Sequence, residues 1–109
     1  MKDMTLREIC NALNISRRAV QGYEKAGLVS ASGKNERGHL IYDENAQKRI
    51  KQIKMFQQMG FSIKEIKMII DAPKDILKSE LEKQVEKRKE EKKNIEVSID
   101  TMYELIDKL

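Results

Sequence analysis

The sequence is poor in the residues that build disulfide-stapled or membrane-spanning proteins. Its 109 residues include no Trp, one Cys and one Pro. One cysteine cannot form an internal disulfide, and no apolar run approaches the roughly 20 residues that a membrane-spanning helix needs. The N-terminus also lacks the apolar core of a signal peptide. We therefore expect a soluble, cytoplasmic protein that does not enter a membrane.

Residues that carry catalytic chemistry are equally scarce. The single histidine, His39, has no Ser/His/Asp set around it, and the chain contains no phosphate-binding loop and no metal-ligand cluster. Cys10 falls on the apolar stripe of the first expected helix, where a free cysteine behaves as a small core hydrophobe. We expect no enzyme activity, no cofactor and no metal site.

Charge is divided unevenly along the chain. Residues 1–71 contain 13 Lys and Arg against 8 Asp and Glu, whereas residues 72–109 contain 9 against 10. A basic segment followed by a balanced one suits a nucleic-acid-binding unit joined to an interaction helix. Ordinary solubility charge is the alternative, because the net charge of +4 is modest.

Two short helices joined by a tight turn are predicted between Thr5 and Leu28. Thr5 followed by Glu8 is a capping-box pattern, which satisfies free N–H groups at a helix start. Ser16 is suited to cap a second helix, and Gly27 is suited to end it. The apolar positions recur at helical spacing, so the helices can pack through Leu6, Ile9, Leu13, Ile15 and Val20. This is a helix-turn-helix arrangement, whose second helix enters the DNA major groove.

A β-hairpin, or wing, is predicted from Val29 to Tyr42. The apolar pieces Leu28-Val29 and Leu40-Ile41-Tyr42 flank a turn-rich centre, which places Lys34 and Arg37 at or near the tip. A basic tip would lie on the phosphate backbone and add affinity rather than sequence readout. A solvated loop is the alternative.

A second pair of helices is predicted to follow the wing. Asp43 can cap a third helix that ends near Met59, and its inner face comprises Ala46, Ile50, Ile53 and Phe56. Ser62 and Glu65 form another capping box, which opens a short fourth helix through Ile63, Ile66, Ile69 and Ile70. Lys64 and the free N–H groups of its first turn are candidates for a phosphate contact. Pro73 ends this section, so we place the DNA-binding domain at residues 1–73.

One long helix is predicted for residues 74–109, which contain no glycine or proline. Its apolar positions alternate steps of four and three, with Arg88 and Lys92 in the middle, and this spacing is a heptad seam. At 1.5 Å per residue the helix would extend about 50 Å, too far to be covered by the rest of one chain. We therefore expect an exposed seam that makes the chain a homodimer, through Leu81, Val85, Ile95, Ile99, Met102, Ile106 and Leu109. The polar middle leaves parallel and antiparallel pairing open.

Three motifs in order resemble the mercury-resistance-regulator (MerR) family of bacterial transcription regulators. Residues 23–28 are similar to its Y-E-x-x-G-L motif, residues 38–42 to its G-Y-R-x-Y motif, and residues 59–66 to its G-F-S-L-x-E-I segment. The resemblance covers nearly the whole chain. It implies a mainly α fold, with a winged helix-turn-helix domain, a small β-hairpin wing and a long C-terminal dimerisation helix in an antiparallel coiled coil.

The resemblance also implies a mechanism. Members of the family bind pseudo-palindromic promoter sites as homodimers and distort the DNA, so that RNA polymerase, a further partner, can engage both promoter elements. This chain departs from the family at Gln21-Gly22, where Arg-Tyr is common, and at His39-Leu40, where the wing usually has Tyr-Arg. Two usual DNA-contacting arginines are therefore missing, and contact would shift to other basic residues.

Sequence-specific binding of double-stranded DNA by a homodimer is the function that these patterns favour. The candidate DNA-contacting residues share a place on the second helix, on the wing or at a helix start, and they are Thr5, Arg17, Arg18, Gln21, Tyr23, Lys25, Lys34, Arg37, His39, Tyr42 and Lys64. An interaction adaptor whose helix-turn-helix no longer reads DNA is the alternative, and the missing arginines motivate it.

Overall fold

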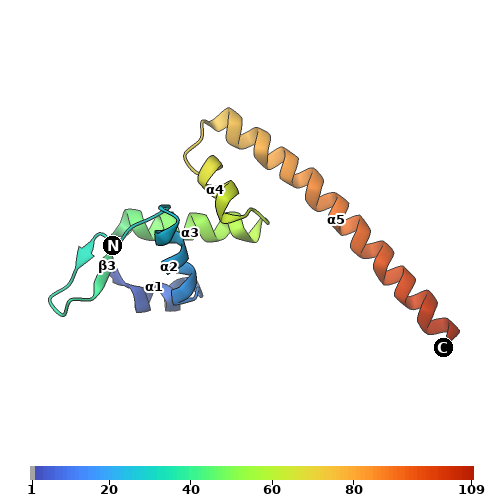
Figure 1. Cartoon of the computed structure of the whole chain (residues 1–109), viewed down its shortest axis with the longest axis horizontal. Helices are drawn as coiled ribbons and strands as arrows, with labels where there is room; N and C mark the ends of the chain where they lie inside the picture. The colour runs from blue at the N-terminus through green and yellow to red at the C-terminus, as the bar shows by residue number, and fades with distance from the viewer. Residues whose placement is uncertain (1) are drawn as a thin grey trace. The chain divides into compact units, whose positions relative to one another are not determined.

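The computed structural model describes residues 2–109, which divide into two units with the boundary between Asp71 and Ala72. The first unit contains four helices and a small sheet, and the second is a single helix (Figure 1). The fold class predicted from the sequence, mainly α with a winged helix-turn-helix and a long C-terminal helix, is confirmed.

The helix-turn-helix consists of α1 (Leu6–Leu13) and α2 (Arg17–Lys25). Both sides of the predicted capping box form, because the Thr5 side chain accepts the Glu8 N–H and the Glu8 side chain accepts the Thr5 N–H. The Ser16 hydroxyl caps α2 by accepting the Ala19 N–H at 3.0 Å. Gly27 follows α2 with a φ of 78°, a left-handed conformation that glycine adopts without steric cost.

The wing belongs to a three-stranded antiparallel sheet rather than to an isolated hairpin. Its strands are β1 (Met4–Thr5), β2 (Gly33–Lys34) and β3 (Leu40–Tyr42), in the order β1-β3-β2. The prediction of two strands missed β1, which pairs Met4 with Tyr42. It also placed the first wing strand at Leu28-Val29, whereas the strand is Gly33–Lys34 and Leu28 is buried in the core.

Helix α3 (Glu44–Gln58) joins the wing to α4 (Ile63–Ile69), and in Figure 1 these two lie at its opposite ends. Asp43 caps α3, and the capping box of Ser62 and Glu65 opens α4, as predicted. Phe61, which precedes that cap, packs edge-to-face on Phe56 with ring centroids 6.0 Å apart.

Three polar side chains of α3 hold the other elements in place. The amide of Gln47, itself buried, donates to the carbonyls of Lys2 and Tyr42, which braces β1 and β3. The ammonium group of Lys54 donates to the carbonyls of Leu13 and Asn14, where α1 ends and its last carbonyls need donors. The third side chain, Arg49, donates to the backbone carbonyl of Leu28 and to the carboxylate of Asp71.

The apolar core of the first unit is built from aliphatic and aromatic side chains of the four helices, of β3 and of the short segments that follow α2, α3 and α4. Its buried members are Ile9, Val20, Tyr23, Leu28, Tyr42, Ala46, Ile50, Ile53, Phe56, Phe61, Ile66, Ile69 and Ile70. All four residues predicted for the inner face of α3 are among them. Burial of these side chains fixes which faces of α2 and the wing remain free.

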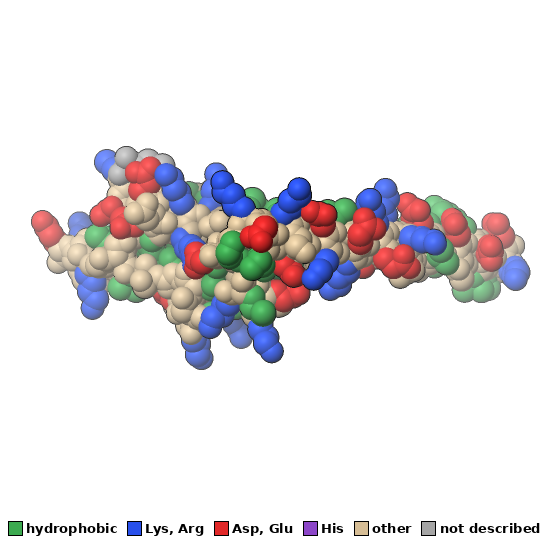
Figure 2. All heavy atoms as spheres, turned by 90° about the horizontal axis from the view of Figure 1, so that it is seen from above, with side chains coloured by type: hydrophobic (Ala, Val, Ile, Leu, Met, Phe, Trp, Pro, Cys, Tyr) green, Lys and Arg blue, Asp and Glu red, His purple; other side chains and the backbone are tan. Residues whose placement is uncertain are grey.

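The second unit is α5 (Lys74–Lys108), 35 residues that begin directly after Pro73. Most of the predicted seam is exposed within one chain: Val85, Ile95, Ile99, Met102, Ile106 and Leu109 are all more than two-fifths accessible, and Leu81 is half-buried. In Figure 2 acidic and basic side chains alternate along α5, and hydrophobic ones gather towards its C-terminal end. None of the described helices is both long enough and apolar enough to cross a membrane.

Candidate nucleic-acid interface

Helix α2 has one buried face and one polar face. Val20 and Tyr23 point into the core, so the helical repeat leaves the opposite side to solvent. That exposed side carries the three cations and the amide predicted for DNA contact, Arg17, Arg18, Gln21 and Lys25. Guanidinium and amide groups in this arrangement can pair with base edges and phosphates.

The tip of the wing is a turn organised by Asn35. Its side-chain oxygen accepts the N–H groups of Arg37 and His39, both at 3.0 Å. Gly38 completes the turn with a φ of 79°, and its N–H donates to the Asn35 carbonyl at 2.9 Å. Lys34, Arg37 and His39 are thereby held exposed at the tip, as the sequence predicted for the first two.

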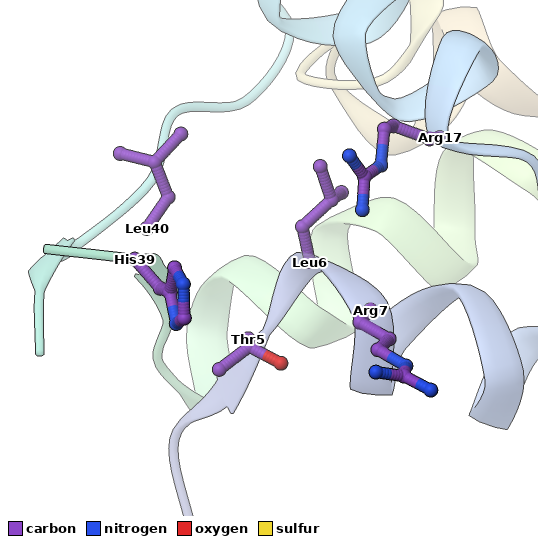
Figure 3. Close-up of a pocket in the computed structure, with 6 residues that line it drawn as sticks. All are labelled: Thr5, Leu6, Arg7, Arg17, His39 and Leu40. Carbon is purple, nitrogen blue, oxygen red and sulfur yellow. The ribbon is translucent and has the colours of Figure 1, made fainter. Parts of the chain in front are cut away.

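A cleft of about 480 Å³ lies between the wing, the start of α1 and the start of α2. It is lined by Thr5, Leu6, Arg7, Arg17, His39 and Leu40, none of which is acidic. Figure 3 shows His39 and Leu40 on the wing side of this cleft, and Leu6, Arg7 and Arg17 on the opposite side. Three predicted residues, Thr5, Arg17 and His39, are therefore brought together from three different elements.

Arg7 is a cleft residue that the sequence did not reveal. It is exposed in the first turn of α1 and lies across the cleft from Leu40, the position where the MerR wing motif usually has arginine. An arginine beside a capping box has no distinguishing pattern in the sequence, because exposed cations are common at helix surfaces. Arg7 and Arg17 share a site only in the folded chain, where α1, α2 and the wing together line the cleft.

Tyr23 and Tyr42, two of the predicted DNA-contacting residues, lie in the core, and their hydroxyls bond to side chains of the protein itself. The ring of Tyr42 is fully buried and its hydroxyl donates to Glu24 Oε1 at 2.7 Å. The hydroxyl of Tyr23, which is 2% exposed, donates to Gln57 Oε1. Burial raises the pKa of both phenols, and the bond to Glu24 adds to the rise for Tyr42, so both remain protonated donors at neutral pH.

Lys64 is exposed in the first turn of α4, but it does not line the cleft. The Ser62 hydroxyl already accepts the Glu65 N–H at 3.1 Å, so part of the predicted donor set is occupied by the capping box. Lys64 therefore stays a separate candidate contact, apart from the wing and the start of α1.

No group of three or more His, Cys, Asp and Glu side chains within residues 2–109 is arranged to hold a metal ion. Cys10, which was expected in the core, is half-buried on α1. The residues that could carry function are thus the cations and polar groups of α2, the wing and the cleft.

A helix-turn-helix with an exposed basic face, flanked by a basic wing, defines a DNA-binding protein of the winged helix-turn-helix class. Residues 4–73 match the MerR HTH family of regulatory proteins. The chain belongs to that family. The resemblance seen in the motifs is confirmed.

Individual relatives agree with this assignment. Nodulation protein NolA of Bradyrhizobium sp. (strain NC92) is 30% identical over 105 residues, which cover 94% of this chain and 40% of NolA. The chain thus spans less than half the length of this relative. A crystal structure of a MerR-family transcriptional regulator from Bacillus cereus superposes with a TM-score of 0.87 at 26% identity, covering 98% of this chain and 82% of that one.

A further structure of the same fold contains DNA. HiNmlR, a MerR-family regulator lacking the sensor domain, was crystallised bound to promoter DNA. It superposes with a TM-score of 0.71 at 21% identity, covering 91% of this chain and 80% of HiNmlR. At this identity the likeness establishes the shared fold.

Proposed function

We propose that this regulator binds a pseudo-palindromic promoter site as a homodimer and distorts it. The observation that carries the proposal is the cleft lined by Arg7, Arg17 and His39, between the wing and the start of α2. A phosphodiester there would meet two guanidinium groups and no carboxylate from the lining. Leu6 and Leu40 line the same space and offer apolar contact to the sugar.

Within this proposal the interface divides its tasks among the predicted residues. Arg17, Arg18, Gln21 and Lys25 would face the major groove, and Lys34 and Arg37 would contact the backbone through the wing tip. Lys64 would supply a further phosphate contact. Arg7 takes over the task of the arginine that position 40 lacks, so the departures from the family motif shift the contacts rather than remove them.

Dimerisation through α5 is supported by its exposed apolar seam and by its charge distribution. Residues 74–94 contain 8 Lys and Arg against 6 Asp and Glu, whereas residues 95–109 contain 1 against 4. Two copies in antiparallel orientation would place the basic part of each helix beside the acidic part of its partner, while parallel copies would pair like with like. The antiparallel coiled coil is therefore the arrangement that we propose.

Distortion follows from having two such interfaces on one dimer. Each subunit would bind the DNA backbone through the wing and the start of α2, and the coiled coil would set the distance between the two subunits' DNA-binding units. DNA whose half-sites do not match that distance must bend or untwist to be bound by both. RNA polymerase would then engage promoter elements whose relative orientation has changed.

The test is fluorescence anisotropy with duplexes selected from a random library, measured at several salt concentrations. Affinity should fall steeply with salt, by about 0.9 log units per log unit of salt for each phosphate neutralised. Arg7→Ala and Arg17→Ala should each weaken binding and reduce that slope by about one. Lys67→Ala, an exposed cation on α4 outside the cleft, is the matched control and should leave the slope unchanged.

An interaction adaptor is the competing function, and Gln21-Gly22 with Leu40 are the observations that favour it. Affinity that stays at the non-specific level for every selected duplex, with no effect of Arg17→Ala, would show that the chain does not read DNA. The adaptor would then be the better description.

A further inference from the structure

The hydroxyl of Tyr42 links the wing to the recognition helix. Tyr42 ends β3, three residues after His39 at the wing tip, and its hydroxyl donates to Glu24 Oε1 of α2 at 2.7 Å. Its ring is fully buried, and Glu24 is half-buried. A phenol that donates to a carboxylate in such surroundings makes a charge-assisted bond, which is stronger than a bond between neutral groups.

Glu24 lies within the same helix as the residues proposed to read DNA. It comes three positions after Gln21 and directly before Lys25, whose side chain is exposed. On the preceding residue, the Tyr23 hydroxyl donates to Gln57 near the end of α3. Adjacent residues of the recognition helix are therefore tied in two directions, Tyr23 to α3 and Glu24 to the wing.

The backbone alone does not make this connection. Seven residues, from Ala26 to Ser32, separate α2 from β2, and the wing strands pair with each other and with β1 rather than with α2. The Tyr42–Glu24 bond is a direct polar contact between the wing strand β3 and α2. Its loss would leave each part folded but would widen the range of angles between them.

We propose that Tyr42 is a positioning residue for DNA recognition, and that its bond to Glu24 fixes the wing relative to the recognition helix. With the bond in place, the wing tip and α2 meet the DNA at one set separation, so that Arg37 contacts a phosphate whenever α2 occupies its half-site. This inference rests on the proposed DNA binding and adds to it a coupling between two parts of the interface.

A double-mutant cycle tests the coupling, using Tyr42→Phe, Arg37→Ala and selected duplex DNA. In the wild-type background, Arg37→Ala should weaken DNA binding. In the Tyr42→Phe background, the loss of affinity caused by Arg37→Ala should be at least about threefold smaller, because the wing is no longer held on its phosphate. Arg18→Ala, on α2 outside the cleft, is the control and should cost the same factor in both backgrounds.

The readout separates positioning from stability. If Tyr42 had a purely structural role, Tyr42→Phe would lower the melting temperature. Arg37→Ala would then reduce DNA affinity by the same factor with and without the hydroxyl, provided that circular dichroism shows both proteins folded. Equal factors would overturn the proposal. Should Tyr42→Phe fail to fold, Glu24→Ala removes the acceptor from the other side and replaces it in the cycle.

Glu24→Gln provides the conservative variant. Its amide oxygen can still accept the Tyr42 hydroxyl, so the full effect of Arg37→Ala should be retained there and lost in Glu24→Ala. A wild-type protein that shows no specific affinity, and no loss with Arg18→Ala, would refute the DNA-binding function itself. If the protein binds DNA specifically but the effects of Tyr42→Phe and Arg37→Ala on affinity are additive, only the positioning role of Tyr42 is refuted.

Discussion

Gly22 lies in the middle of the recognition helix, on its exposed side. Leaving aside the backbone of its own helix, a Cβ added there would meet no atom within 4 Å. Glycine in a helix interior costs about 0.5–1 kcal/mol relative to alanine, and no tight packing in the chain requires it. Under the proposed function, the close approach of DNA to that face would account for the glycine.

Replacing Gly22 with alanine should separate the two effects. We expect Gly22→Ala to raise the free energy of unfolding by about 0.5–1 kcal/mol, measured by urea denaturation. The same variant should bind selected DNA more weakly, because the added methyl group stands on the face that the duplex approaches. Unchanged affinity alongside the gain in stability would show that DNA does not come close at this position.

At the residue scale, the sequence revealed the cations but not their partners. Arg17, Lys34 and Arg37 lie where helix and turn patterns placed them. Arg7 escaped notice because its significance depends on the wing folding towards α1. The bond from the Tyr42 hydroxyl to Glu24 was not predicted, because Glu24 is 18 residues away in the chain and spacing alone does not distinguish a carboxylate acceptor from a phosphate.

Elements of the first unit are joined by the side chain of Arg49 on α3. Its Nε donates to the carbonyl of Leu28, just after α2, at 2.9 Å. Its two terminal nitrogens donate to the two carboxylate oxygens of Asp71, each at 2.7 Å. One guanidinium therefore connects α3, the end of the helix-turn-helix and the last residue of the unit.

This ion pair predicts a pH dependence of stability. The bond from Arg49 lowers the pKa of Asp71 below its ordinary value, so the pair adds stability at pH values above about 3.9, the unfolded-state value, and loses it as the pH falls through the lower folded pKa. Urea denaturation between pH 7 and pH 2 measures this dependence. At neutral pH the free energy of unfolding of the wild type should exceed that of Asp71→Asn, and the difference should disappear below about pH 4. Because Asp71 is exposed, the gap should be small.

Asp75→Asn is the matched control, since it removes a carboxylate in the first turn of α5 outside this pair. A gap between wild type and Asp71→Asn that persists unchanged at pH 2 would mean that the ion pair is not its cause.

At the element scale, the sequence predicted elements whose ends are set by local chemistry, and it failed for strands whose positions depend on pairing with a distant strand. Capping boxes at Thr5 and Ser62 are local, and both form as expected. The strand β1 has only two residues, too few for an alternating pattern, and exists because β3 pairs with it. The first wing strand was misplaced because Leu28 is apolar for another reason, namely burial in the core.

At the scale of the whole molecule, the proposed dimer depends on the exposed seam of α5. Ile99→Asp combined with Ile106→Asp should yield monomers in analytical ultracentrifugation. The substitutions remove apolar contacts from the seam, and the new carboxylates would lose their hydration if the coiled coil formed. The monomer should also lose cooperative binding to two half-sites. Dimers that survive the double substitution would place the interface elsewhere.

Val97 offers a control on the same helix. It is 56% exposed, similar to Ile99 and Ile106, but helical spacing puts it on the opposite side from the seam. Val97→Asp should therefore leave the dimer intact. Loss of the dimer in this variant as well would indicate that added negative charge, rather than the seam, controls association.

The Arg49–Asp71 ion pair also indicates where the chain can be joined to a different C-terminal helix. A chimera that joins residues up to 71 to a different long helix keeps both guanidinium contacts, whereas a crossover one residue earlier discards the carboxylate. Grafts made after Asp71 would therefore pass on an intact DNA-binding unit, and the new helix would determine how far apart two such units are held. In the proposed dimer, the grafted helix would then set the half-site spacing while the proposed recognition surface stayed unchanged.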